Sequence, residues 1–278
     1  MKKIVLITIS LLSYVATFAQ NYKSEGDSLA AAGNYTAAAA MYELCMEQDE
    51  DCLLKLFGLI RDEKITPQFT NEHFNLISQL AQKGNLYAQG YLGKMYYIGN
   101  GVTQDYQKSK EWFQKSAEQN DSYSQYYMGM MYRLGLSVEK DYQEAVKWYK
   151  KSAEQGYSFG QCGLGFMYRH GYGVKQDYQE AVKWFLMSAE QGDRIAQNNL
   201  GEMYRDGLGV EQNYQEFVKW FQKSAEQGDI STQYYLGWMY ENGKYVTKNI
   251  EKAIEWYQKA AEQGNQNASD NLKRLGKD

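Results

Sequence analysis

Apolar residues recur along the chain with the spacing of amphipathic helices, and this pattern repeats. In one stretch they follow the i, i+4, i+7, i+8 spacing of a single helical stripe, at Ala88, Leu92, Met95 and Tyr96. Gly99 comes next, and glycine readily adopts the positive φ that commonly ends a helix. The pattern predicts a first helix over residues 86–98.

A second apolar stripe follows a glycine-rich turn. It is preceded in every copy by a side chain suited to cap free backbone amides, namely Asp105, Asp141, Asp177, Asn213 and Asn249. In three copies a glutamate stands three residues later, at Glu144, Glu180 and Glu216, which predicts a capping-box start. The letters AEQG close this second helix in most copies, so each copy reads as a helical hairpin.

The hairpin recurs with a fixed period. Tryptophans lie 36 residues apart at Trp112, Trp148, Trp184, Trp220 and Trp256, and five copies run without insertion over residues 81–260. One hairpin cannot bury its apolar faces alone, so neighbouring copies must stack. The sequence therefore predicts an all-α solenoid of stacked antiparallel helix hairpins.

The repeated letters AEQG…AQ…LG.MY..G.GV..DY.EAVKW resemble the Sel-one-like repeat, a branch of the tetratricopeptide-type α-solenoids. Ser137 and Tyr245 depart from this pattern at the second glycine of the turn. The resemblance implies a right-handed superhelical solenoid whose first helices line a concave, ligand-binding surface. It also implies a non-catalytic adaptor that assembles protein complexes.

The predicted organisation has four parts. Residues 1–19 are a signal peptide, and residues 20–80 hold a tetratricopeptide-like hairpin, turning at Gly33-Asn34, followed by a degenerate repeat. Five repeats then cover residues 81–116, 117–152, 153–188, 189–224 and 225–260. Residues 261–278 form a capping helix that carries Leu272 and Leu275 on one side.

The first residues have the features of a secretory signal. Lys2 and Lys3 precede a short apolar run, and small residues suit a cut after Ala19, ahead of Gln20. We expect an exported, periplasmic or secreted protein with no membrane-spanning helix. The signal holds two of the 30 basic residues and none of the 34 acidic ones, which leaves 28 basic side chains. This acidic balance argues against nucleic acid as a partner.

On the first helix, the positions opposite the repeated stripe vary between copies. A contiguous exposed apolar patch usually marks an interaction site. The varying residues therefore form a candidate partner-binding groove: Tyr123, Tyr126, Met130, Arg133, Phe159, Phe166, Arg169, Asn198, Glu202, Arg205, Tyr234 and Trp238. The aromatic residues would anchor a partner, and the arginines would select its acidic groups. In the alternative interpretation, the arginines are solvated residues near helix ends and neighbouring repeats bury the aromatic rings.

Candidates for catalysis are weak. Cys162 and His170 share a predicted helix, but eight residues at 1.5 Å each separate them by roughly 12 Å, beyond the reach of a nucleophile and its base. The chain has two histidines, and no ligand spacing predicts a metal or cofactor site. Cys45 closes one helix and Cys52 opens the next, so these two are candidates for a disulfide, which would leave Cys162 as a small buried hydrophobe.

Three functions remain open at this stage. The first is a non-catalytic scaffold that binds a protein or peptide in the cell envelope or outside the cell, as a monomer or an oligomer. The second is a module for glycans or cell wall, because aromatic side chains such as Tyr234 and Trp238 can stack on sugars. The third is a hydrolase resembling the β-lactamase-like activity attributed to some exported cysteine-rich relatives, against which the missing base and nucleophile argue.

Overall fold

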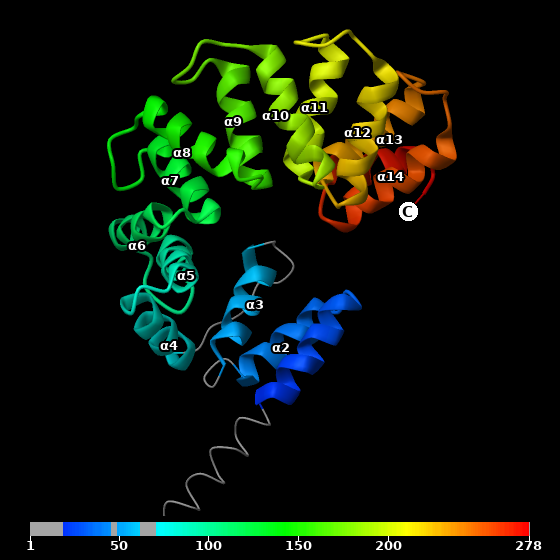
Figure 1. Cartoon of the computed structure of the whole chain (residues 1–278). Coiled ribbons are helices and arrows are strands. Elements are labelled where there is room, and N and C mark those ends of the chain that lie inside the picture. Colours follow the sequence, from blue (N-terminus) through cyan, green and yellow to red (C-terminus); the bar gives the residue numbers. More distant parts are fainter. Residues whose placement is uncertain (1–18, 46–48, 62–70, 278) are drawn as a thin grey trace, which may run out of the picture. The chain divides into compact units, whose positions relative to one another are not determined.

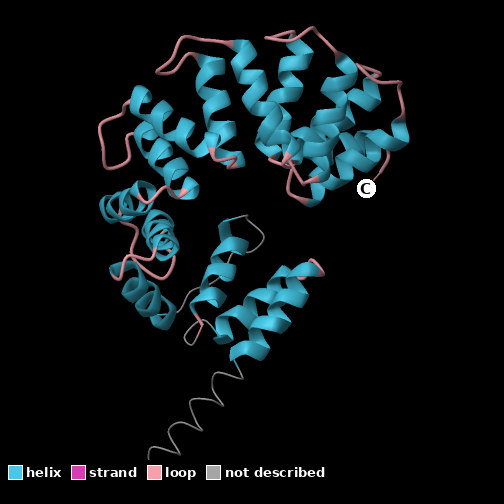
Figure 2. Ribbon diagram, in the orientation of Figure 1, coloured by secondary structure: helices cyan, strands magenta, loops and turns pink. Residues whose placement is uncertain are grey.

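The structure is a computed structural model that describes residues 19–45, 49–61 and 71–277, and every regular element within these ranges is a helix (Figures 1 and 2). Residues 19–31 are helical. The helices that follow are α2 (Tyr35–Cys45), α3 (Glu50–Arg61), α4 (Asn71–Gln82), α5 (Leu86–Ile98), α6 (Tyr106–Glu118), α7 (Ser122–Leu134), α8 (Tyr142–Glu154), α9 (Ser158–His170), α10 (Tyr178–Glu190), α11 (Arg194–Asp206), α12 (Tyr214–Glu226), α13 (Ile230–Asn242), α14 (Ile250–Glu262) and α15 (Gln266–Arg274). The all-α prediction is confirmed, and so are the predicted bounds of the first helix. The predicted signal peptide lies outside the described residues except for Ala19.

The chain forms two compact units, Met1–Ser124 and Gln125–Asp278, and the boundary falls within α7. From α8 to α15, each helix packs on the next one in the sequence, and so do α4 on α5 and α5 on α6. The hairpin pairs include α5 with α6, α9 with α10, α11 with α12 and α13 with α14, and neighbouring hairpins meet where α8 packs on α9 and α10 on α11. This is the predicted stacking of hairpins. We call α5, α7, α9, α11 and α13 the first helices, and α6, α8, α10, α12 and α14 the second helices.

A close approach between a ring and the helix backbone defines each hairpin. The first helices carry Gly93, Gly129, Gly165, Gly201 and Gly237, and an aromatic ring of the second helix lies flat against each of these glycines. A Cβ atom at Gly237 would stand 2.5 Å from Cδ1 of Tyr257, far inside van der Waals contact. The five rings belong to Phe113, Tyr149, Phe185, Phe221 and Tyr257, which are at most 4% exposed. The glycine of the repeated LG pair is therefore a packing requirement.

The second helices begin with the predicted caps. The side chain of Asp141, for example, accepts hydrogen bonds from the amides of Gln143 and Glu144. The reciprocal half of the predicted capping box is wrong. The amide of Asp141, which Glu144 would have to bind, already donates to the carbonyl of Tyr132 at 3.0 Å. Glu144 pairs with Lys147 instead, and Glu180 and Glu216 likewise pair with lysines.

The turn between the two helices keeps one geometry despite the two departures in sequence. Gly101, Gly173 and Gly209 have φ near +70°, and Ser137 and Tyr245 adopt φ of 60° and 65° at the same position. A non-glycine residue there costs about 1–2 kcal/mol. Tyr245 offsets this cost by packing, because its ring lies 4.5 Å from that of Tyr214 and 5.3 Å from that of Phe217.

The described residues of the predicted N-terminal hairpin and of the predicted C-terminal cap form helices. In the N-terminal region, Gly33 turns the chain at φ 77° between residues 19–31 and α2, and the predicted disulfide joins Cys45 to Cys52 with the Cα atoms 5.9 Å apart. At the C-terminus, α15 buries Leu272, and Arg274 pairs with Glu241 of α13 at 2.5 Å.

Replacing Gly237 by alanine should destabilise the fold, because the added Cβ forces the Tyr257 ring or the helix to move, at a cost of about 1–3 kcal/mol. The melting temperature of the helical circular dichroism signal measures this effect. Gly58→Ala is the matched control, since a Cβ at this helical glycine meets nothing within 4 Å, and it should leave the melting temperature unchanged or raise it. Equal losses in the two variants would contradict the packing argument.

The Cys45–Cys52 disulfide closes a loop with a sequence separation of 7, so its reduction should cost about 2–3 kcal/mol on the chain-entropy account. We expect a reducing agent to lower the melting temperature of the native chain. A Cys45→Ala, Cys52→Ala variant serves as the control and should melt at the same temperature with or without reductant. A shift of equal size in that variant would place the effect elsewhere.

Candidate binding face of the first helices

Buried glutamines hold the first helices in register. Gln89, Gln125, Gln161, Gln197 and Gln233 are at most 5% exposed. The side-chain amide of Gln227, just after the end of α12, donates to the side-chain oxygen of Gln197 at 2.8 Å. Gln197 in turn donates to the carbonyl of Ala189 in the preceding repeat at 3.2 Å. The glutamine contact within the repeat recurs in all five copies. This role of the glutamines was not predicted from the sequence, although both glutamines recur in every copy.

Serines near the ends of the second helices make a second set of ties. The hydroxyl of Ser188 donates to the carbonyl of Ser158 at 2.8 Å, and Ser224 reaches the carbonyl of Arg194 in the same way. These serines are fully buried. With the glutamines, they fix the first turn of their first helix against the end of the second helix.

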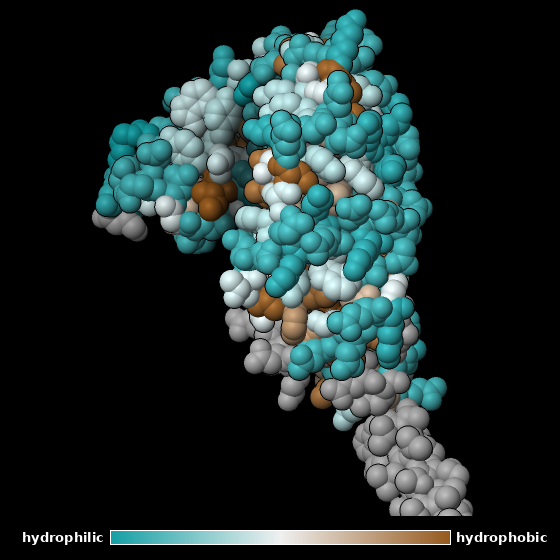
Figure 3. Space-filling view, turned by 90° about the vertical axis from the view of Figure 1, so that its left-hand side faces the viewer, coloured by the Kyte–Doolittle hydropathy of each residue, from teal (hydrophilic) through white to brown (hydrophobic). Residues whose placement is uncertain are grey.

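The varying positions of the first helices are mostly covered. Tyr123 is only 8% exposed and packs on Phe113, so it lies in the core of the first unit and does not line a groove. The other eleven predicted groove residues are partly buried. On the side seen in Figure 3, hydrophilic side chains cover most of the surface and the hydrophobic ones form small separate patches. The aromatic positions thus serve partly as contacts between repeats, as the alternative interpretation expected.

Tyr126 shows how such a position is used. Its ring centroid lies 5.9 Å from those of Tyr149, Tyr157 and Phe159. Tyr126 and Phe159, two predicted groove residues of neighbouring repeats, are therefore in contact. Burial raises the pKa of Tyr126 well above its ordinary value, so the hydroxyl stays protonated. Met130 packs on the hydrophobic cluster around Tyr149. This part of the face is a ring cluster with little free surface.

Arg133 is held in place from two sides. Its Nε donates to the hydroxyl of Tyr149 at 3.2 Å, and its guanidinium lies 5.5 Å from the ring centre of Phe166. Phe166 continues into a stack, because its ring centroid is 4.4 Å from that of His170, and His170 stacks on Tyr172. Burial and the charge of Arg169 lower the pKa of His170, which keeps the imidazole neutral near pH 7.

The other two predicted arginines have acidic partners within the chain. Arg169 reaches into the next repeat, where Glu202 accepts at 2.8 Å and Asn199 at 2.7 Å. Arg205 forms a bidentate pair with Asp206 at 2.7 and 2.8 Å. We expected Arg169 and Arg205 to select acidic groups on a partner, but their donors are engaged in pairs that link or stiffen the repeats. Glu202 is used in the same way.

The remaining predicted residues are also engaged. Asn198 donates to the Thr232 hydroxyl at 2.9 Å. Tyr234 packs on Tyr257 with 5.7 Å between ring centroids, whereas Trp238 stacks on Tyr235 at 5.4 Å. Tyr234 and Trp238, named together as a surface for sugars, thus contact different rings.

The cysteine and acidic residues show no catalytic arrangement among the described residues. Burial raises the pKa of the Cys162 thiol well above its ordinary value, and a protonated thiol is a poor nucleophile. In the part of the chain that the structure describes, no group of three or more His, Cys, Asp or Glu side chains is placed to hold a metal ion. The geometry of the face is that of a packed helical surface.

The 36-residue hairpin matches a known repeat. The Sel1 repeat is found five times in succession, at residues 86–121, 122–157, 158–193, 194–229 and 230–265. This chain belongs to the Sel1 repeat family. The matched repeats begin at the first helix, five residues later than the boundaries chosen from the sequence, and they have the same period.

Solved structures of Sel1-repeat proteins resemble the chain. A Sel1 repeat protein from Oxalobacter formigenes is 31% identical, with a TM-score of 0.70 over 86% of this chain and 99% of that one. A protective antigen of uropathogenic Escherichia coli strains, which displays an SLR fold, is 34% identical, with a TM-score of 0.62. The match covers 93% of this chain but only 57% of that antigen.

An immunity protein from Pseudomonas aeruginosa, 22% identical, shares the fold with a TM-score of 0.50 over 69% of this chain and 73% of that one. Among curated proteins, none matches the chain. Sel1 repeats are commonly protein-interaction modules and generally non-catalytic scaffolds. Within the described residues, none of the helices combines the length and apolar character needed to cross a membrane.

The Arg205–Asp206 pair can be tested by titration. The hydrogen bond from Arg205 lowers the pKa of Asp206 below its ordinary value. A depressed folded pKa stabilises the fold above the ordinary value of about 3.9, and this stability is lost as pH falls through the folded pKa. Arg205→Gln should raise the pKa of Asp206 toward its ordinary value, as carboxyl carbon NMR shifts against pH would report. Arg194→Gln, whose arginine pairs with Asp229, should leave it unchanged, and an effect of equal size there would refute the assignment.

Proposed function

We propose that this chain is a non-catalytic scaffold that binds a protein or peptide partner, as Sel1 repeats commonly do. The first helices of the unit Gln125–Asp278 supply the binding face, and its centre is Arg133 with the stack of Phe166, His170 and Tyr172. The partner contributes an acidic group to this point. Binding of this kind requires no bound cofactor.

Arg133 carries the proposal because its position is fixed while its charge is unpaired. Arg169, Arg194, Arg205 and Arg274 each have a carboxylate within ion-pair distance. Arg133 has none among the described residues of its unit, and its Nε alone is occupied, by Tyr149. A guanidinium presents five N–H donors and suits bidentate recognition of a carboxylate. Pre-organisation by Tyr149 and Phe166 reduces the entropy lost on binding.

Aromatic surface adjoins this charge. Tyr172 is 37% exposed, stacks on Tyr142 at 4.8 Å and lies beside His170. Interfaces are enriched in tyrosine and arginine, which combine buried area with hydrogen bonding. An acidic residue flanked by apolar side chains on the partner would therefore complement this part of the face.

We further propose that the scaffold acts outside the cytoplasm, in the cell envelope or the secreted space. Two features support this location. The basic and apolar residues ahead of Ala19 have the pattern of a secretory signal, and the Cys45–Cys52 disulfide is typical of an oxidising compartment.

Affinity capture from the envelope fraction of the source organism would test the binding face. We compare the native chain with an Arg133→Gln, Tyr172→Ser double variant. A partner should be retained by the native chain, lost from the variant, and released by an acidic peptide or by salt, because screening weakens the interaction of charges.

The matched control is a Lys175→Gln, Tyr214→Ser variant. It also removes one positive charge and one exposed tyrosine whose ring contacts another ring, but neither residue belongs to the stack of Phe166, His170 and Tyr172. The control should retain the partner. Retention by all three proteins would place binding on another surface, and loss from both variants would show that the effect is not specific to Arg133.

A further inference from the structure

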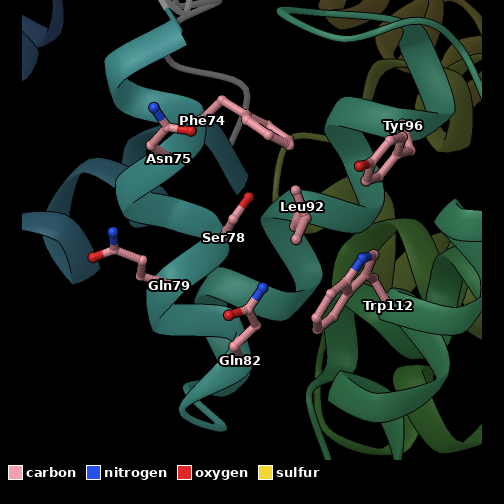
Figure 4. A pocket seen from close by; sticks show the side chains of 8 residues that line it. All are labelled: Phe74, Asn75, Ser78, Gln79, Gln82, Leu92, Tyr96 and Trp112. Atoms are coloured by element: carbon pink, nitrogen blue, oxygen red, sulfur yellow. The ribbon is translucent and has the colours of Figure 1, made fainter.

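A cavity of about 430 Å³ lies between α4, α5 and α6, within the unit Met1–Ser124. Figure 4 shows its two walls, with side chains of α4 on one side and Leu92, Tyr96 and Trp112 on the other. Its volume lies in the range of about 300–1,000 Å³ that is usual for small-molecule sites. The cavity is separate from the binding face around Arg133.

The cavity exists because of one short side chain. Ser78 occupies the position that the five following repeats fill with a longer residue, namely Gln114, Lys150, Leu186, Gln222 and Gln258. Between α12 and α13, the side chain of Gln222 fills the equivalent space and donates to the hydroxyl of Tyr240 at 3.0 Å. Tyr96 is the counterpart of Tyr240, but Ser78 is too short to reach it. The hydroxyl of Ser78 is buried, has no hydrogen-bond partner among the described residues, and points into the space between α4 and α5 (Figure 4).

Around the cavity, α4 has uncharged residues at positions where the later second helices mostly have charged ones. Gln82 stands where the later repeats have a glutamate each time, at Glu118, Glu154, Glu190, Glu226 and Glu262. Asn75 replaces a residue that is charged in all five later copies, and Gln79 replaces a residue that is lysine in four of them. Three carboxamides therefore border the cavity, and none of the lining residues that the structure describes is charged. A carboxamide both donates and accepts hydrogen bonds.

Aromatic rings form the rest of the lining. Phe74 and Tyr96 meet edge to face with centroids 6.3 Å apart, and Trp112 lines the same wall as Tyr96 (Figure 4). The ammonium of Lys115 lies 4.3 Å from the Trp112 ring centre, a contact that Trp148, Trp220 and Trp256 also make with a lysine. That lysine therefore belongs to the shared scaffold of the repeat. The rings offer flat apolar surface directly beside the amides.

We propose that this cavity binds a neutral saccharide. A purely apolar ligand would leave the Ser78 hydroxyl buried without a partner among the described residues, which is unfavourable. A charged ligand would find no counter-charge among the lining residues that the structure describes. A neutral sugar meets both conditions, because its hydroxyls pair with Ser78 and the carboxamides while its C–H faces lie on the rings of Tyr96 or Trp112.

A glycan array with the fluorescently labelled full chain tests the ligand class, since it presents neutral and acidic glycans together. We expect retention of neutral glycans that persists at about 0.5 M salt, where charge interactions are screened. A titration calorimetry series with a retained neutral oligosaccharide then compares variants. Ser78→Gln, which introduces the residue found at Gln114, Gln222 and Gln258 and fills the cavity, should weaken binding about tenfold or more.

Two further variants keep the test decisive. Gln82→Glu restores the charge of the later repeats at an exposed position and should also weaken binding of the neutral sugar, without affecting the melting temperature. Gln222→Ser, the reverse exchange in the other unit, should leave saccharide binding unchanged and serves as the control. The proposal is overturned if the array retains no neutral glycan, if only acidic glycans or peptides bind, or if Ser78→Gln and Gln82→Glu bind as tightly as the native chain.

Discussion

The contact of an aromatic ring with a bare helix backbone is the constraint on which the solenoid depends. Phe113 and its counterparts lie against Gly93 and its counterparts so closely that no Cβ fits between them. This sets the distance between the two helices of each hairpin. Four of the buried glutamines then join their hairpin to the one before, through a side chain and a backbone carbonyl. Once these two contacts are set, the outer positions are free to vary.

That freedom is used in two ways. Arg169 with Glu202, and Glu241 with Arg274, occupy varying positions and tie one repeat to the next or to the terminal helix. Arg133 occupies an equivalent position and is fixed only by a phenol and a ring. The difference follows from the neighbouring repeat. Position 202 supplies a carboxylate to Arg169, whereas Phe166 stands at the same place opposite Arg133. A charge without a carboxylate partner among the described residues, beside arginines that have one, is the reason to assign binding there.

The cavity in the first unit also lies where residues differ between the repeats. Its walls are repeat positions, but α4 has a serine and three carboxamides where later copies have longer or charged residues. A degenerate repeat at the end of a solenoid would ordinarily only cap the core. Here the departures from the pattern coincide in space and leave a polar atom without a partner. In a repeat protein, the regular copies show what the fold requires, so the irregular copy shows what has been changed.

The sequence alone was sufficient for the local structure. Period, helix bounds, N-caps and left-handed turns depend on residues a few positions apart, so Leu86–Ile98 and Asp141 were predicted correctly. It was insufficient wherever an outcome depended on the rotation and spacing of successive hairpins. The burial of Tyr123 and the pairing of Arg169 are of that kind. The tertiary structure decided these, because a helical pattern specifies which residues share a face but not which residue of the next repeat stands opposite.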